Sequence, residues 1–147
     1  HSFPTRRSSD FNNNLTLKLL DVSNNPNCSG IYIEGNAGIS NILIDGVKSH
    51  GHGPSARGIV IWNGFKSNIT IQNCEVYSNN CCGIELQDGT ASGVTLSNNN
   101  VHDNADSGLS ATGMTGPSAN LISGNTVTNN GRFGIEAKLP NGSGDKS

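Results

Sequence analysis

The sequence is poor in charged residues, aromatic residues and strong helix formers. Charged residues make up 14% and aromatic residues 5% of its 147 residues, with a single Trp and a single Met. No apolar run is longer than a few residues, which excludes a membrane-spanning helix. The formal net charge of −2 gives no basis for binding nucleic acid. The chain instead contains 19 Gly and 22 Asn, a composition typical of short strands joined by turns.

The first ten residues, HSFPTRRSSD, differ from everything that follows. A signal peptide would need an apolar core after its basic start, but Ser8, Ser9 and Asp10 follow the two arginines. The segment resembles the translation of a short-read sequencing adapter. We therefore expect residues 1–10 to be a non-native, adapter-derived segment. Without it the chain has seven basic and ten acidic residues, a formal net charge of −3.

A repeat of about 26 residues appears when the chain is aligned on its Gly-Ile and Gly-Leu pairs. The repeats begin, at spacings of 28, 25, 25 and 26 residues, at Gly30, Gly58, Gly83, Gly108 and Gly134. A second apolar pair follows about ten residues later, such as Ile69 and Ile71, and then a valine such as Val76. Each repeat therefore predicts three strands of about three to five residues in which apolar and polar side chains alternate.

Asparagine recurs three residues after the valine, at Asn25, Asn79, Asn104 and Asn130. Asn tolerates a left-handed backbone, and stacked Asn side chains can pass amide hydrogen bonds from coil to coil. The column of Asn79, Asn104 and Asn130 and the column of Asn73 and Asn98 therefore predict amide ladders. The repeat that contains Val47 is two residues short in this alignment, which places His50 at the Asn position.

One such unit cannot bury its own apolar side, whereas stacked units can. The repeat resembles the right-handed parallel β-helix family over residues 14–138, most closely in NITIQNCEVYSNN, GVTLSNNNVHDN and LISGNTVTNNG. The resemblance implies an all-β, right-handed parallel β-helix of roughly five three-strand coils over residues 11–138, without caps. Residues 139–147 are then a turn or tail leading to missing coils, and those flanking coils of the same chain are expected partners.

Alternation along the Gly-Ile strands assigns one side of each strand to the core and the other to the surface. Two outward columns result, Tyr32/Val60/Glu85/Ser110/Glu136 and Glu34/Trp62/Gln87/Thr112/Lys138. Aromatic rings stack on the C–H faces of sugars, while carboxylates and amides hydrogen-bond to their hydroxyls. We therefore predict that polysaccharide is bound by Tyr32, Glu34, Trp62, Glu85, Gln87 and Glu136. The alternative is that these are ordinary solvent-facing residues of a sheet.

No catalytic residue can be assigned from the sequence. Glu85 and Glu136 lie two coils apart, roughly 9.6 Å at the usual strand spacing, at the upper limit for an inverting glycosidase pair, about 6.5–9.5 Å. Asp88 could bind calcium or act as an acid, but Asp88-Gly89 is first a turn signal. Gly51-His52-Gly53 resembles an element of polygalacturonases, yet their Asp pair and Arg-Ile-Lys element are absent, so their activity is not inferred.

The sequence predicts no metal site, and calcium is the only cofactor left open. His50 and His52 lack an obvious third ligand and are expected to be exposed loop residues. The four cysteines are expected to be free thiols, because Cys28 and Cys81 fall two coils apart and adjacent cysteines rarely pair. At the turns, Arg57, Asp106 and Arg132 are expected to line a groove beside the predicted binding surface.

Two functions are consistent with these features. The first, implied by the family resemblance, is a fragment of a secreted or cell-surface protein that binds or processes polysaccharide, as a lyase, hydrolase or epimerase. The second is a non-catalytic structural or adhesin-type β-helix module. The absence of a paired Asp motif favours the second for this segment, and whether the protein is an enzyme is left open.

Overall fold

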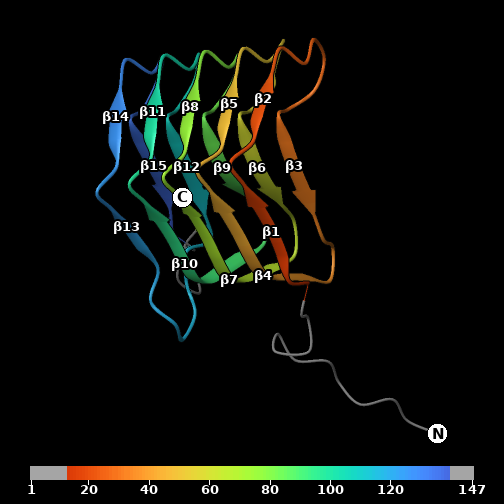
Figure 1. The fold of residues 1–147 in the computed structure, drawn as a ribbon. Coiled ribbons are helices and arrows are strands. Elements are labelled where there is room, and N and C mark those ends of the chain that lie inside the picture. The colour runs from red at the N-terminus through yellow and green to blue at the C-terminus, as the bar shows by residue number, and fades with distance from the viewer. Residues whose placement is uncertain (1–12, 140–147) are drawn as a thin grey trace, which may run out of the picture.

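The computed structural model describes residues 13–139, and these residues form a parallel β-helix (Figure 1). The segment predicted at residues 1–10 lies outside this range, as does all of the tail predicted at residues 139–147 except Leu139. The described residues form strands and no helix, so none of them belongs to a helix that could span a membrane. Each coil contributes one strand to each of three sheets, which we call sheets A, B and C.

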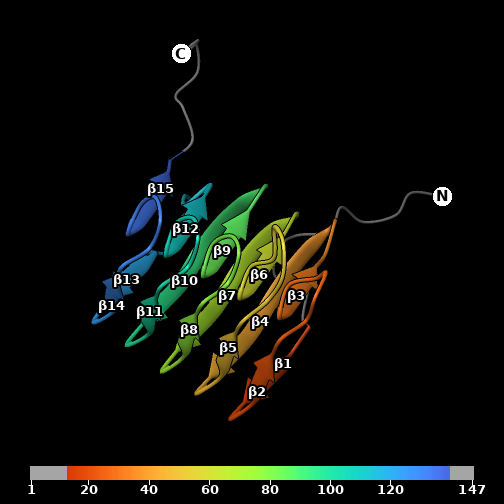
Figure 2. The ribbon, with the colours of Figure 1, turned by 90° about the horizontal axis from the view of Figure 1, so that it is seen from above.

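Every strand pairs in parallel with its counterparts in the neighbouring coils. Sheet A consists of β1 (Leu15–Lys18), β4 (Gly38–Asp45), β7 (Phe65–Gln72), β10 (Thr90–Ser97) and β13 (Leu121–Ser123). Sheet B consists of β2 (Asp21–Ser23), β5 (Lys48–His50), β8 (Glu75–Tyr77), β11 (Asn100–His102) and β14 (Thr126–Thr128). Sheet C consists of β3 (Ile31–Glu34), β6 (Ile59–Trp62), β9 (Ile84–Gln87), β12 (Leu109–Thr112) and β15 (Ile135–Lys138). Figure 2 shows the coils following one another along one axis.

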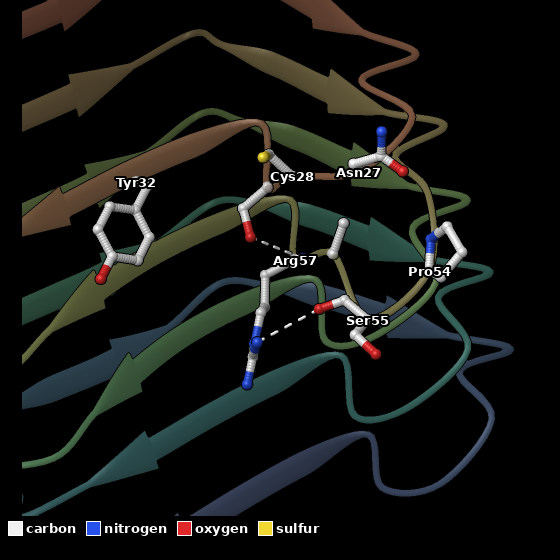
Figure 3. Close-up of a pocket in the computed structure, with 8 residues that line it drawn as sticks. Asn27, Cys28, Tyr32, Pro54, Ser55 and Arg57 are labelled. Atoms are coloured by element: carbon white, nitrogen blue, oxygen red, sulfur yellow. Dashed lines mark hydrogen bonds between the residues drawn. The ribbon is translucent and has the colours of Figure 1, made fainter.

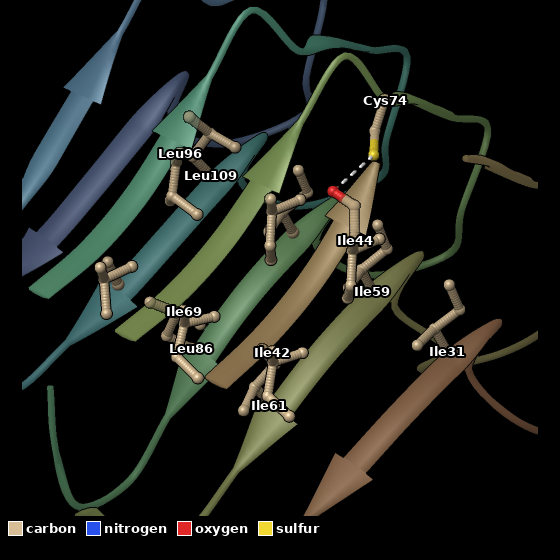
Figure 4. Close-up of a cluster of buried hydrophobic side chains, with 14 of the residues drawn as sticks. Ile31, Ile42, Ile44, Ile59, Ile61, Ile69, Cys74, Leu86, Leu96 and Leu109 are labelled. Atoms are coloured by element: carbon tan, nitrogen blue, oxygen red, sulfur yellow. Dashed lines mark hydrogen bonds between the residues drawn. The ribbon is translucent and has the colours of Figure 1, made fainter. Parts of the chain in front are cut away.

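The core consists of apolar side chains stacked from coil to coil (Figure 4). On sheet C, Ile59, Ile61 and Leu86 are fully buried, and Ile44 and Ile71 meet them from sheet A. These positions confirm the inward face that the alternation predicts. Burying one such side chain stabilises the fold by about 1.5–3 kcal/mol, so the stacked columns are the main source of its stability.

The predicted strand length is wrong for the inner strands of sheet A. Strands β4, β7 and β10 each have eight residues instead of the expected three to five. Asn41, Asn68 and Gly93 occupy the middle of these strands with φ values of 58°, 51° and 68°. Asn and Gly tolerate this left-handed conformation, so each strand bends at that residue and continues instead of ending there.

The register of sheet B corrects the prediction for the coil around Val47. Ser49 pairs with Val22 on one side and with Val76 on the other, so this coil is not shortened. Val47 is also buried in the core, which explains why it resembles the strand valine. As a result His52, and not His50, takes the Asn position.

The main predicted amide ladder is confirmed. The side-chain amide of Asn79 donates to Asn104 at 2.9 Å, and that of Asn104 donates to Asn130 at 3.0 Å. Asn73 and Asn98 have the left-handed backbone expected of turn residues. The side chain of Asn73 donates to Asp45, however, and no amide hydrogen bond joins Asn73 to Asn98 among residues 13–139.

Candidate functional site

The outer face of sheet C carries the residues that the sequence predicts to bind polysaccharide. The strand register places Tyr32, Val60, Glu85, Ser110 and Glu136 in one column. It places Glu34, Trp62 and Gln87 in the next column. Both predicted columns are therefore present, and five coils present them along one face of the molecule.

The first column is less exposed than a solvent-facing column should be. Tyr32 is 51% exposed, but Val60, Glu85 and Ser110 are 1%, 9% and 4% exposed. Glu85 is covered by Arg57 from the turn of the preceding coil. Of these four side chains, only that of Tyr32 in the first coil is exposed.

Two aromatic rings lie next to each other at that exposed end. Tyr32 of β3 and Trp62 of β6 have ring centroids 6.2 Å apart, with their planes tilted by 45°. Burial and the neighbouring carboxylate of Glu34 raise the pKa of Tyr32, so its hydroxyl stays protonated at neutral pH and can donate a hydrogen bond. The pair offers an apolar platform with a polar edge.

Arg57 connects the platform to the polar residues. Its Nε donates to Oε2 of Glu85 at 2.5 Å, and a terminal nitrogen donates to Oε1 of Gln87 at 3.2 Å. The guanidinium carbon also lies 5.8 Å from the ring centroid of Trp62. Burial opposes the charge of Arg57, but the ion pair with Glu85 outweighs burial and raises the pKa of Arg57. Four side chains from three adjacent segments therefore form one cluster.

An open pocket of about 480 Å³ lies beside Arg57 and Tyr32 (Figure 3). The turns of two successive coils form its wall, and its lining residues are Asn27, Cys28, Ser29, Tyr32, Pro54, Ser55, Ala56 and Arg57. A terminal nitrogen of Arg57 donates to the backbone carbonyl of Ser55, and Ser29 accepts from the backbone N–H of Arg57. These bonds hold the pocket wall and the guanidinium in one arrangement.

The two remaining predicted residues lie apart from this cluster. Glu34 is exposed and accepts a hydrogen bond from Asn63 at 3.1 Å. Glu136 lies two coils beyond Glu85, where it accepts from Ser110 at 3.2 Å and pairs with Lys138 at 3.3 Å. Burial favours the protonated form of Glu136, but Lys138 and Ser110 outweigh it and lower the pKa of Glu136.

The two loop histidines do not form a site together. His52 is fully buried, which contradicts the expectation of an exposed loop residue, because it replaces Asn in the ladder. His50 lies on the outside of sheet B, where it contacts Asp21 and stacks on Tyr77 at 4.6 Å. Asp88 is a turn residue with φ of 56°, as its Asp-Gly sequence predicts.

Sequence reasoning missed a group of residues at the edge of sheet C. The side chains of Cys81, Cys82 and Asp106 offer a sulfur or oxygen atom each, and these atoms lie within 4.8 Å of one another. Cys81 and Asp106 occupy the same position in successive coils, two residues before the Gly that begins each repeat. That shared position is the one signal of the group in the sequence.

The comparisons with known proteins agree with this architecture. Residues 7–142 match the family described as a right handed beta helix region. No curated protein and no solved structure matches at a significant level. All four cysteines are free in the structure, as predicted. With nearly its whole length matched and three parallel sheets stacked around one core, the chain belongs to the right-handed β-helix family.

Proposed function

We propose that the outer face of sheet C binds polysaccharide. The observation that carries this proposal is the cluster in which Tyr32 and Trp62 lie 6.2 Å apart, beside Arg57 with its hydrogen bonds to Glu85 and Gln87. Sugar rings stack on aromatic faces, and ordered polar side chains select the orientation of their hydroxyls. The adjoining pocket gives room for a residue of the chain beside Tyr32.

An uncharged polysaccharide fits this surface better than a polyuronate. Arg57 is already paired with Glu85, and Lys138 is paired with Glu136. The exposed carboxylate of Glu34 adds negative charge next to the aromatic platform. An anionic chain would meet paired cations and the carboxylate of Glu34, which has no cationic partner among the described residues, and this favours neutral sugars.

The carboxylates of Glu85 and Glu136 favour binding without hydrolysis. A glycosidase general acid must be protonated while it works, and its pKa is usually raised for that purpose. Lys138 and Ser110 instead lower the pKa of Glu136 against the effect of burial, and Glu85 is held in an ion pair by Arg57. We therefore favour a non-catalytic carbohydrate-binding module of a secreted or cell-surface protein, where polysaccharides are encountered.

Affinity electrophoresis of the full chain through gels that contain soluble neutral or acidic polysaccharides tests this proposal. We expect retardation by a neutral polysaccharide, and a loss of affinity on the order of tenfold for Trp62→Ala or Tyr32→Ala. Tyr77→Ala is the matched control, because it removes an aromatic ring from the outer face of sheet B. Circular dichroism confirms that each variant is folded. Absence of retardation in every gel, or equal losses for Tyr77→Ala, would overturn the proposal.

Product analysis separates binding from catalysis. The retarding polysaccharide is incubated with the protein, and new reducing ends and unsaturated products are measured. We expect neither, because the carboxylates of Glu85 and Glu136 both have cationic partners. Products that disappear in Glu85→Gln or Glu136→Gln would assign the face to an enzyme.

A further inference from the structure

A cluster of two thiols and a carboxylate lies at the edge of sheet C, outside the polysaccharide cluster. Cys81 and Cys82 are adjacent in the turn before β9, and Asp106 lies in the same turn of the following coil. The backbone N–H of Asp106 donates to the carbonyl of Cys81 at 3.1 Å, which fixes the two turns against each other. The sulfur atoms of Cys81 and Cys82 and a carboxylate oxygen of Asp106 lie within 4.8 Å of one another.

These distances suit a metal ion of the zinc class. Zinc binds thiolate sulfur at about 2.3 Å in a tetrahedral arrangement, which places two sulfur ligands about 3.8 Å apart. The three candidate ligand atoms, which lie within 4.8 Å of one another, are close to that separation. Cys81 and Asp106 are partly exposed, so solvent can supply a fourth ligand.

The ligands would carry enough charge for such an ion. Two thiolates and one carboxylate bring three negative charges to a divalent cation. Ser107 extends the polar surroundings, because its hydroxyl donates to Asp106 at 3.5 Å. The carboxylate of Glu85 is already held by Arg57 and does not compete for the ion.

A catalytic thiol is a poorer explanation of the same cluster. A reactive cysteine needs access to its substrate, whereas Cys82 is only 4% exposed. A bound metal ion would instead displace the thiol protons directly.

We propose that Cys81, Cys82 and Asp106 form a three-ligand site for a thiophilic divalent cation of the zinc and cadmium class. The proposal is independent of polysaccharide binding, because none of its three ligands is a residue predicted to bind polysaccharide. The ion would join the turns of two successive coils at the edge of sheet C.

Titration of the full chain with Cd²⁺ tests the site, under a non-thiol reductant that keeps the cysteines free. Cadmium thiolate bonds absorb in the ultraviolet, and native mass spectrometry counts the ions bound to each monomer. We expect one Cd²⁺ per monomer and competition by Zn²⁺. Loss of an outer partner of a metal ligand costs about 10–100-fold in affinity, so loss of a ligand in Cys81→Ser or Asp106→Asn should cost at least that much.

Cys28→Ser is the matched control, because it removes an exposed free thiol in the same column two coils away. Cys81 and Asp106 are partly exposed, so their substitution should leave the core intact. Cys82 is buried, so the folding of a third variant, Cys82→Ser, is checked by circular dichroism. Binding that survives in both Cys81→Ser and Asp106→Asn, binding that Cys28→Ser abolishes, or no stoichiometric binding at all would overturn the proposal.

Discussion

His52 occupies the position that asparagine holds in the other coils, although its side chain is different. Its Nδ1 accepts from the backbone N–H of Asn25 at 3.2 Å, as an Asn oxygen would. The hydroxyl of Ser49 donates to the carbonyl of Gly58 at 2.7 Å, so Nε2–H of His52 donates to that hydroxyl at 3.0 Å. This arrangement needs a neutral imidazole, because a proton on Nδ1 would face the N–H of Asn25.

The pH dependence of stability should therefore change in His52→Asn. Burial lowers the pKa of His52, and the charge of His50 adds to this effect. The unfolded chain, with a histidine pKa of about 6.5, binds the proton first as the pH falls, so the folded state loses stability below about pH 6.5. We expect the melting temperature to fall less between about pH 7.5 and pH 5.5 in His52→Asn than in the parent chain. Equal falls in the two proteins would contradict this assignment.

The raised pKa of His102 works in the opposite direction, but it is common to both proteins and cancels in the comparison. The hydrogen bond that His102 donates to the carboxylate of Asp103 is the main cause of that raised pKa, so its contribution is present at low pH and is lost as the pH rises. His102→Gln in both backgrounds checks the cancellation. The difference between the parent and His52→Asn should persist there.

Lys66 marks the limit of residue-level prediction. It pairs with Ile39 and Ala91 in neighbouring strands, faces the core and is fully buried. Its ammonium donates to the backbone carbonyls of Gly64, Gln87 and Asp88. Burial lowers the pKa of Lys66 to about 8. The residue type predicts an exposed lysine at this position. Only the structure shows the carbonyl oxygens that accept hydrogen bonds from its ammonium group.

The asparagine ladders are the elements that hold one turn of each coil to the next. Asn104 is 2% exposed and uses its whole amide group. It donates to the carbonyl of Val76 at 3.2 Å and to Asn130, and it accepts from both the backbone and the side chain of Asn79. A second ladder, in which Asn99 donates to Asn125 at 2.9 Å, lies at the start of sheet B.

Asn104→Ala should destabilise the protein strongly. It leaves a buried N–H of Asn79 and the carbonyl of Val76 without partners, and each such group costs about 1–3 kcal/mol. We expect a loss of about 2–4 kcal/mol in the free energy of unfolding, measured by urea denaturation followed by circular dichroism. Asn100→Ala is the matched control in the same coil, because the side chain of Asn100 is exposed. A similar loss in both variants would show that the ladder does not contribute.

The stacking of equivalent coils in the whole molecule explains which predictions from the sequence are confirmed. The inward columns of sheet C could be predicted because every coil repeats the same apolar alternation, and stacking requires equivalent residues to coincide. For the surface, the sequence predicts which residues share a column but not which side chains contact one another. Arg57 covers Glu85 through its side-chain conformation, and the Cys81–Asp106 contact joins two coils through a turn. The periodicity aligns Cys81 with Asp106, but it does not show which side chains meet across the turns.

The same reasoning predicts that one coil can be removed as a unit. Deletion of residues 83–107 joins Cys82 to Gly108 and places β12 beside β6 in the register that β9 now has, because Ile59, Ile84 and Leu109 share one column. A repeat protein loses one unit and one interface in this way, roughly a quarter of the inter-coil contacts of a five-coil stack.

We expect the deleted protein to remain a cooperatively melting β-protein with a lower melting temperature, as measured by circular dichroism. Deletion of residues 83–94 is the control. It removes fewer residues but takes β9 and part of β10, so the remaining strands can no longer pair with equivalent positions. That shorter deletion should abolish the cooperative transition. If it were instead better tolerated than removal of the full coil, stability would depend on the number of residues retained and not on the stacking of equivalent coils.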